Sequence, residues 1–323
     1  MPSDAAHADL VLRPIAGPEE IDLFNSLPYT INHELADDLA EDRRRAGWMW
    51  LALRGDRVVA RLAWWARTGT GEPLFLDILD IDGTDPEAAD AARALYAAAS
   101  AAVLPAGATP PEYERFIPAD WREEPVARRA VETRMEVLES AGARLVVERL
   151  RLEWRPGTEL PPRDPRLAFR PALDDAELLA LQTRTLEGTL DFHSQDDLKK
   201  MPAAEVAQQQ WDDEFARYTT PREWWQIATL ADTGEAIGFV ICAHNGYNPV
   251  LAYIGVVPEH RGKGYIHGIL GEGTRILAAQ DVPRIRAATD LGNVPMAAAF
   301  ARAGYVNFER AINMAWDTSP AGV

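Results

Sequence analysis

The sequence contains a single cysteine, Cys242, among 323 residues. One cysteine excludes an internal disulfide bond and is typical of a reducing compartment, so we expect a cytoplasmic protein. Cys242 lies in an apolar stretch, and we interpret it as a buried structural thiol. The N-terminus has neither a basic nor an apolar segment, so no signal peptide is expected. The six histidines are scattered without an H-x-x-x-H pair, and we expect no metal site.

Basic residues are scarce: 33 Lys and Arg stand against 50 Asp and Glu, for a net charge of −17. This charge balance argues against a nucleic-acid partner, because binding nucleic acid requires a basic protein surface. It is compatible with a cationic small-molecule acceptor such as an amine, although solubility alone also explains it. The uncharged run 236–258 is broken by turn chemistry at 244–249, which predicts two hairpin strands and not a membrane span. We expect no nucleic-acid or membrane partner, and a monomer or homodimer.

The most informative stretch, Val256–Tyr265, has the sequence Val-Val-Pro-Glu-His-Arg-Gly-Lys-Gly-Tyr. A β-prone run precedes it and apolar residues at helical spacing follow it, which predicts a strand, a turn and a helix. Free N–H groups and the helix dipole attract an anion at such a helix N-terminus. Gly262 and Gly264 permit positive φ and close approach of a ligand. Because Arg261 and Lys263 add positive charge, the residues alone predict a phosphate or pyrophosphate site.

This stretch has neither the GK[ST] of a Walker loop nor the GxGxxG of a dinucleotide-binding turn. Its pattern V-x-P-x-x-R-G-x-G, opening a helix, resembles the acetyl-CoA site of the GNAT superfamily of N-acetyltransferases; an ordinary basic turn is the alternative. The resemblance implies that turn amides hold the CoA pyrophosphate and that the preceding strand splays from its neighbour to pair with pantetheine. The family usually has Gly or Ala at the position of Ile266. Asn293 is expected to contact the cofactor, to cap the following helix, or both. The implied cofactor-binding residues are Ile254, Gly255, Val256, Arg261, Gly262, Lys263, Gly264, Tyr265, Ile266 and Asn293.

The length of the chain favours two domains. Residues 155–165 contain four prolines and are interpreted as a linker, between a domain at 10–154 and a GNAT acetyltransferase domain at 166–323. Residues 1–9 are expected to be a disordered tail. Two landmarks recur: the Arg-Pro at Arg13 and again at Arg170 (170 − 13 = 157), and the Ala-Gly at Ala141 and again at Ala303 (303 − 141 = 162). The near-constant offsets suggest two copies of one fold.

The first copy has an acidic segment, 82–87, where the second has its basic turn. Carboxylates repel a pyrophosphate, so this copy resembles a degenerate GNAT domain that has lost CoA binding; a coincidental α/β likeness is the alternative. The resemblance implies an α/β (α+β) fold of two tandem GNAT-like domains. Each has a mixed, mostly antiparallel sheet flanked by helices, with a splayed acetyl-CoA-binding strand pair in the C-terminal copy. The proline-rich segment 105–118 is expected to be an irregular loop.

Acetyl transfer to an amine needs a neutral nucleophile, stabilisation of the thioester oxygen and a proton for the departing thiolate. The resemblance implies that a backbone amide near Val256 serves the oxygen. Many family members have a glutamate where this chain has Val250 and a tyrosine where it has Phe300. Neither of these side chains can transfer a proton. The acid and base therefore come from elsewhere, or the site binds CoA without fast chemistry.

Substitutes occur in the loop 186–194, which the resemblance places over the acceptor side. His193 changes charge near neutral pH and is our candidate base, with a solvated loop residue as the alternative. Glu187 or Asp191 is the candidate for binding a cationic acceptor. Tyr253 and Tyr265 are candidate acids beside the thiol, each with a packing aromatic as the alternative, and Tyr253 is the one we include in the catalytic set. The predicted catalytic set is therefore His193, Glu187 and Tyr253.

These observations favour an acetyl-CoA-dependent acyltransferase that acetylates an amine of a small molecule, such as a metabolite or an antibiotic-like compound. A non-catalytic CoA-binding or scaffold protein is the alternative that the substitutions at Val250 and Phe300 leave open. Acetylation of a protein N-terminus or lysine is a further alternative, and an open groove beyond the thiol would favour it.

Overall fold

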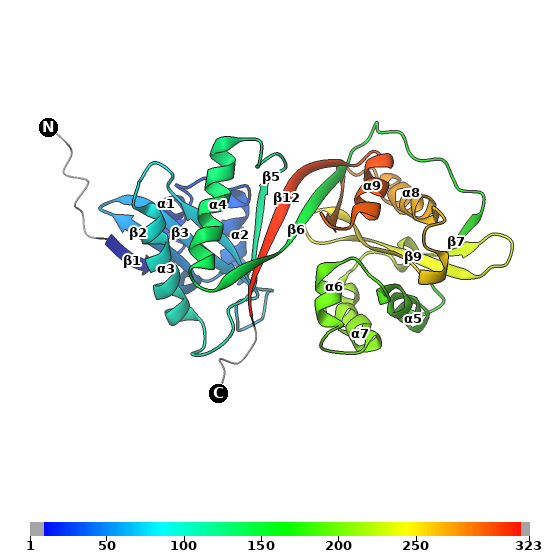
Figure 1. Ribbon diagram of the computed structural model, residues 1–323, viewed down its shortest axis with the longest axis horizontal. Helices are drawn as coiled ribbons and strands as arrows, with labels where there is room; N and C mark the ends of the chain where they lie inside the picture. Colours follow the sequence, from blue (N-terminus) through cyan, green and yellow to red (C-terminus); the bar gives the residue numbers. More distant parts are fainter. Residues whose placement is uncertain (1–9, 318–323) are drawn as a thin grey trace. The chain divides into compact units, whose positions relative to one another are not determined.

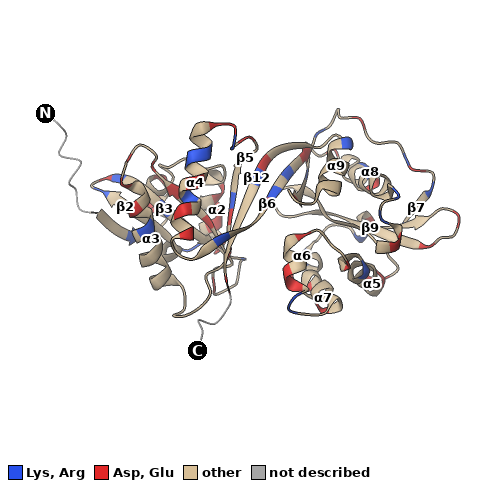
Figure 2. Cartoon of the chain, viewed as in Figure 1, with Lys and Arg blue, Asp and Glu red and all other residues tan. Residues whose placement is uncertain are grey.

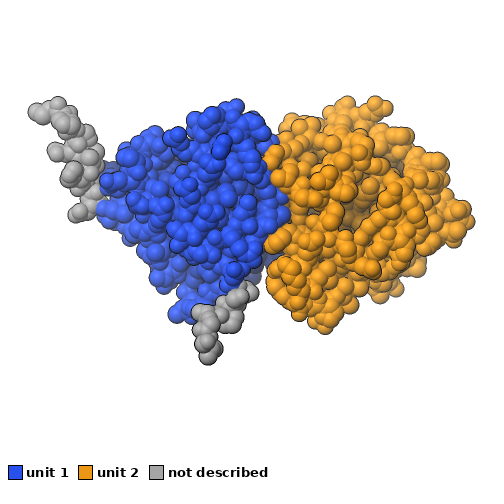
Figure 3. Space-filling model, viewed as in Figure 1, with its two compact units in different colours: residues 1–148, 311–323 blue, residues 149–310 orange. Residues whose placement is uncertain are grey.

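The computed structural model describes residues 10–317, so the predicted tail at residues 1–9 lies outside the described part. The described chain divides into two compact units, residues 10–148 with 311–317 and residues 149–310 (Figure 3). The division falls inside two long strands, β6 (Ala143–Trp154) and β12 (Val306–Trp316). The predicted linker, residues 155–165, contains no helix or strand and lies within the second unit. That residues 10–154 and 166–323 fold as independent copies stays a prediction.

The first unit is built on a sheet with strand order β1-β2-β3-β4-β5-β12-β6 (Figure 1). Strands β1 to β4 are antiparallel neighbours, and β4 and β5 are parallel. The last strand of the chain, β12, therefore lies between β5 and β6. The other strands are β1 (Leu10–Pro14), β2 (Met49–Arg54), β3 (Arg57–Trp65), β4 (Phe75–Ile81) and β5 (Tyr113–Pro118), and the α-helices are α1 (Ile21–Phe24), α2 (Leu35–Ala40), α3 (Ala88–Val103) and α4 (Pro125–Glu139).

Strand β5 corrects the expected irregular loop at 105–118. Its inward positions, Tyr113, Arg115 and Ile117, alternate with more exposed ones. Period-two alternation is the pattern of a strand. It is hidden in the sequence because the prolines on both sides favour a loop and one inward residue is an arginine, which is seldom buried without a partner.

The second unit repeats this architecture on a sheet with strand order β6-β11-β10-β9-β8-β7. Strands β7 to β10 are antiparallel neighbours and β10 and β11 are parallel. Strand β6, from the middle of the chain, pairs antiparallel with β11. The elements are β7 (Leu167–Pro171), α5 (Asp175–Leu186), α6 (Phe192–Asp197), α7 (Ala203–Asp213), β8 (Gln226–Leu230), β9 (Ala236–His244), β10 (Pro249–Val256), α8 (Tyr265–Ala278), β11 (Ile285–Asp290) and α9 (Val294–Arg302).

Helices cover both faces of the second sheet, with α8 and α9 on one side and α5 to α7 on the other (Figure 1). Helix α8 lies close against β9 and β10 because glycine faces the strands. A Cβ on Gly273 would come within 2.8 Å of Leu251 and Val240 side chains. This close approach places the N-terminus of α8 at the end of β10.

The mixed, mostly antiparallel sheets flanked by helices confirm the predicted α/β fold class. Within residues 10–317 no helix combines the length and apolar character that crossing a bilayer requires.

Candidate active site

Strand β10 separates from its parallel neighbour along most of its length. In the described chain, its register with β11 consists of one pair, Val250 with Arg286. On its other edge β10 stays paired with β9 as far as Val256, with an irregularity between Leu251 and Tyr253. The β11-facing edge from Tyr253 to Val256 is therefore left open, as the predicted splay requires.

A cavity of about 350 Å³ lies along this open edge. Its walls come from β10, from the turn before α8 and the first residues of that helix, from the end of α5 with its following loop, and from the start of α9. The lining residues are Thr185, Gly188, Thr189, Leu190, Tyr253, Ile254, Gly255, Val256, His260, Arg261, Gly262, Gly264, Tyr265, Ile266, Asn293, Pro295 and Met296.

The turn before α8 has the backbone conformation that an anion site needs. Gly262 and Gly264 have φ of 76° and 81°, a region that side chains other than glycine rarely adopt. Gly264 is the N-cap of α8 and supplies no side-chain cap to the first N–H groups of the helix. The N–H of His267 donates to the carbonyl of Gly264 at 3.2 Å. The donors before it, at the positive end of a 14-residue helix, can bind an anion.

The side chain of Arg261 forms hydrogen bonds with backbone carbonyls of α5 and β10. Its Nε donates to the carbonyl of Val256 (3.0 Å), its Nη2 to that of Thr185 (2.8 Å) and its Nη1 to that of Glu187 (2.6 Å). The last carbonyls of α5 lack partners within the helix, and a cation at a helix C-terminus is favourable. Arg261 therefore ties the end of α5 to the open end of β10. Its predicted contact with the cofactor stays a prediction.

Helix α5 contacts β10 at Gly255. A Cβ at this position would lie 2.9 Å from Cγ2 of Thr185, so any larger residue would push α5 away from the strand. The hydroxyl of Thr185 donates to the carbonyl of Gln182 at 2.8 Å and also forms a hydrogen bond with Tyr253. Because residue 255 is a glycine, α5 lies close enough to β10 for the hydroxyl of Thr185 to reach Tyr253 on the open edge.

Tyr253 is held in a fixed orientation beside the cavity. Its ring stacks on Phe239, with centroids 5.5 Å apart, and meets Phe215 edge-on. Burial, together with the charge of Asp191, raises the pKa of Tyr253 to about 12. The phenol is therefore protonated at neutral pH and can donate a proton.

Two acidic groups, Asp191 and Asp290, interact electrostatically with each other, and Asp191 also acts on Tyr253. Asp290, at the end of β11, accepts the backbone N–H of Phe192 at 2.6 Å and pairs with Nε of Arg149 at 3.0 Å. Burial raises the pKa of Asp290, while Arg149 acts against this shift. Asp191 caps α6, and Figure 2 shows further acidic positions on that helix. His193 on α6 interacts electrostatically with Asp290.

The structure brings nine of the ten predicted cofactor-binding residues to one cavity, because all but Lys263 line it. Lys263 is exposed, and its carbonyl accepts from Arg166 at 3.2 Å. Asn293 lines the cavity and also caps α9 by accepting from the N–H of Met296 at 3.3 Å. The position of Asn293 is therefore compatible with both predicted roles, contact with the cofactor and capping of α9. The binding roles of the ten residues stay predictions.

The three predicted catalytic residues are distributed differently. Tyr253 lines the cavity, and Glu187 and His193 are not among its lining residues. Glu187 is exposed and uses its carbonyl to bind Arg261. Phe300 is 2% exposed, packs against Tyr305 and does not line the cavity. Within residues 10–317 no group of three or more His, Cys, Asp or Glu side chains is arranged to hold a metal ion.

Sequence reasoning missed several side chains that shape the cavity, among them Thr185 and Met296. Neither belongs to a local motif, since each reaches the cavity through the packing of α5 or α9. The nearest signal was Gly255: a glycine inside a strand marks the close approach of another element. His260, in the turn before α8, had no predicted role. It lines the cavity while its Nε2 contacts Glu235 at 3.1 Å.

Two parallel strands that separate beside a helix N-terminus leave an open backbone edge next to N–H groups that can bind an anion. Residues 166–306 match the family described as acetyltransferase (GNAT) domain. The chain therefore carries a GNAT domain in this segment, as predicted, and no curated protein matches the sequence significantly.

Solved structures extend the likeness to nearly the whole chain. A GCN5-related N-acetyltransferase from Sphaerobacter thermophilus is 14% identical, with 99% of this chain and 98% of that chain covered and a TM-score of 0.59. A tandem GNAT protein from the clavulanic acid biosynthesis pathway is 14% identical, with 97% and 100% covered and a TM-score of 0.54. A glucosamine N-acetyltransferase region of a fungal multi-domain β-N-acetylglucosaminidase is 13% identical, with 95% and 38% covered and a TM-score of 0.57. At these identities the likeness shows the fold alone, and it includes the fold of a tandem GNAT protein. The family match over residues 166–306 is what supports acetyl transfer in general.

Proposed function

We propose that the second unit binds acetyl-CoA and transfers its acetyl group to an amine of a small molecule. The observation that carries this proposal is the open edge of β10, which has an uncapped helix N-terminus at one end and a protonated tyrosine near the other. A CoA thioester is long and bears phosphates at one end and the acetyl group at the other. The cavity has anion-binding N–H groups at the end where the phosphates would lie and the tyrosine hydroxyl at the end where the acetyl group would lie.

The residues of the turn fit the phosphate end of this cofactor. The amides around Gly262 and Gly264 would hold the pyrophosphate, and the exposed Lys263 would add charge. Backbone groups of β10 between Tyr253 and Val256 would pair with the amides of pantetheine. When bound, acetyl-CoA supplies the acetyl group as a reactive thioester.

The remaining residues suit the acceptor end. A backbone amide of β10 at the Tyr253 end of the open edge, and not one near Val256 beside the turn, would stabilise charge on the thioester oxygen. Tyr253 would return a proton to the sulfur as the C–S bond breaks and the C–N bond forms. The amine loses a proton in the same reaction, and His193, supported by Asp290, is our candidate to accept it. Asp191 would attract a cationic acceptor.

Substitution of Tyr253 by phenylalanine tests the proton donor. We expect the turnover number of Tyr253→Phe to fall about a hundredfold, because a side-chain acid typically contributes that much or more. The dissociation constant for acetyl-CoA should change little, since the ring and its stacking remain. Tyr305→Phe is the matched control, because Tyr305 is a buried tyrosine of the same unit whose hydroxyl contacts Thr274 and which does not line the cavity; it should keep the parent's turnover. An unchanged turnover in Tyr253→Phe would exclude the proposed role.

Substitution of His193 by alanine tests the base. We expect His193→Ala to lower turnover at neutral pH by at least about tenfold and to leave the affinity for CoA intact. The pH–rate profile should lose its acidic limb, a change that damage to the fold would not produce. His244→Ala, in an exposed hairpin turn, is the control. A profile identical to the parent's would show that His193 is not the base.

The whole proposal is tested by acetyl-CoA binding and by acetylation of a diverse panel of small amines and of peptides. Turnover with small amines supports the enzyme. Tight binding with neither acetylation nor thioester hydrolysis supports the non-catalytic alternative, which Val250 and the buried Phe300 favour. Turnover on peptide N-termini or lysines alone supports the protein acetyltransferase.

A further inference from the structure

The first unit contains its own pair of separating parallel strands. The register between β4 and β5 consists, in the described chain, of the pair Leu76 with Tyr113, which corresponds to the single pair between β10 and β11. Here the opening is closed by a side chain of α4. Nε of Arg134 donates to the carbonyl of Leu79 on β4 at 2.8 Å.

Buried charges fill the space between these strands. The carboxylate of Asp80, on β4, contacts Arg61 at 2.8 Å, Arg115 at 2.6 Å and Arg134 at 3.2 Å. Asp80 is 2% exposed, and the side chains of Arg61 and Arg115 are 0% and 5% exposed. One negative charge thus faces three positive charges, which leaves a local excess of two.

The neighbouring acidic groups do not balance this excess. Asp77 pairs with Arg44 at 2.5 Å, and Asp38 pairs with Arg44 at 2.9 Å and with Arg43 at 2.7 Å. These two carboxylates are therefore matched by two other arginines. The other partner of Arg115 is the ring of Tyr29, 3.7 Å from its guanidinium carbon. A buried charge without a counter-charge is costly, so this excess calls for an anion.

A small cavity lies against these cations. The centre of a water-sized particle can occupy about 10 Å³ of it, so the void itself is larger than one water molecule and has room for one small ion or water molecule. In the part of the chain that the structure describes, Nη1 of Arg115 and the hydroxyl of Tyr113 are buried and have no hydrogen-bond partner. Both residues line the cavity, together with Ile117, Val131, Arg134, Met135 and Ile312.

We propose that this cavity binds one small monovalent anion, a halide such as chloride, between Tyr113 and Arg115. Apart from the tyrosine hydroxyl, the polar side-chain groups around it are guanidinium donors. A water molecule there would accept hydrogen bonds but would have only the phenol oxygen to receive its own hydrogens. An anion accepts from every donor and reduces the excess positive charge. In this unit the anion and Arg134 would occupy the space between the strands, and the site is independent of the acetyl-transfer proposal.

Bromide, which scatters anomalously, locates such a site directly. Crystals of the full chain soaked in bromide should show an anomalous peak within hydrogen-bond distance of Nη1 of Arg115 and the hydroxyl of Tyr113. In solution, the melting temperature should be higher in sodium chloride or bromide than in sodium gluconate at equal ionic strength. We expect a saturable difference of about 2–4 °C, because a ligand that binds only the folded state raises its stability.

Tyr113→Phe removes one ligand of the anion and keeps the ring. This variant should lose most of the difference between chloride and gluconate, whereas Tyr96→Phe, a buried tyrosine of the same unit that does not line the cavity, should keep it. Anomalous peaks confined to surface cations would overturn the proposal. So would equal melting temperatures in the two salts, or an undiminished difference in Tyr113→Phe.

Discussion

Replacing Gly264 by aspartate is expected to lower the affinity for acetyl-CoA by at least about a hundredfold. Gly264 has a φ of 81°, and a residue with a Cβ pays about 1–2 kcal/mol to adopt that conformation. The new carboxylate would also stand at the helix N-terminus, where it would take the amides intended for the pyrophosphate and repel its charge. Titration calorimetry with acetyl-CoA measures the loss.

Two further variants separate these causes. Gly264→Ala retains the backbone cost without the charge, and we expect a loss of roughly tenfold. Crowding contributes little, because the nearest atom to the added Cβ would be 3.9 Å away. Gly83→Asp makes the same change in the acidic segment of the first unit and should leave the affinity unchanged. Two CoA sites per chain, or an unchanged affinity in Gly264→Asp, would contradict the prediction that only the second unit binds CoA.

The turn and its two flanking elements could be predicted because the information is local. A β-prone run, two glycines and an amphipathic helix are contiguous, and each glycine has the positive φ that its presence suggested. The residues that the resemblance implied around this turn, with the exception of Lys263, line one cavity for the same reason. The positions of residues that depend only on their neighbours along the chain could therefore be predicted from the sequence.

Features that depend on packing between distant segments were not predictable. The side chain of Arg261 binds the carbonyls that end α5, and its direction follows from where that helix lies. Thr185 reaches the cavity for the same reason. The placement of β12 beside β5, and of β6 beside β11, requires a choice between strands of similar composition. Burial of Arg115 depends on the register of β5, which one sequence cannot supply.

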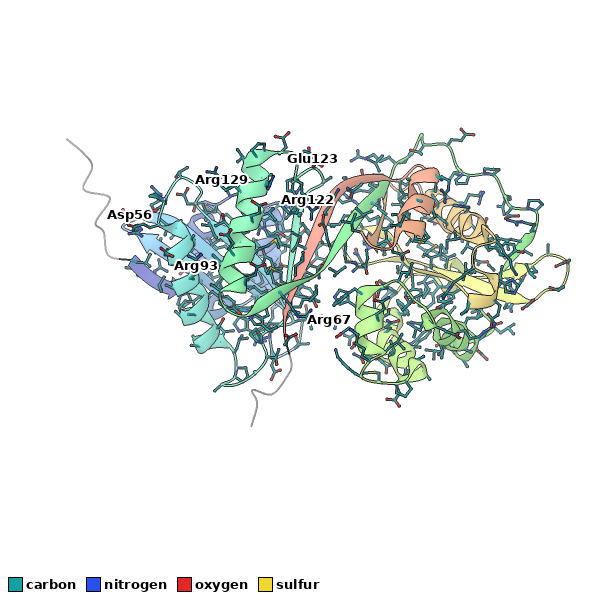
Figure 4. All side chains as sticks on the ribbon, viewed as in Figure 1. Asp56, Arg67, Arg93, Arg122, Glu123 and Arg129 are labelled. Atoms are coloured by element: carbon teal, nitrogen blue, oxygen red, sulfur yellow. The ribbon has the colours of Figure 1, made fainter. Side chains whose placement is uncertain are left out.

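Replacing Asp80 by asparagine is expected to cause the largest loss of stability in the chain. The substitution leaves three buried or nearly buried guanidinium groups without their shared carboxylate, and breaking a buried ion pair costs about 3–5 kcal/mol. Chemical denaturation at neutral pH measures this difference. Asp90→Asn is the matched control, because Asp90 forms an exposed pair with Arg93 in the same unit, and such pairs contribute about 0–1 kcal/mol. In contrast to the buried Asp80, surface side chains of this unit such as Asp56, Glu123 and Arg129 point outward (Figure 4).

The pH dependence of the parent protein gives this prediction a second readout. Burial alone would raise the pKa of Asp80, but Arg115, Arg61 and Arg134 together lower it below its ordinary value. A carboxylate whose folded-state pKa is depressed stabilises the fold fully above its unfolded pKa, about 3.9, and loses this contribution as the pH falls through the folded value. The stability difference between parent and Asp80→Asn should therefore be constant from about pH 5 to 7 and narrow only below about pH 4. A difference that is small at neutral pH, or that narrows already above pH 5, would show that the arginine cluster does not depend on Asp80.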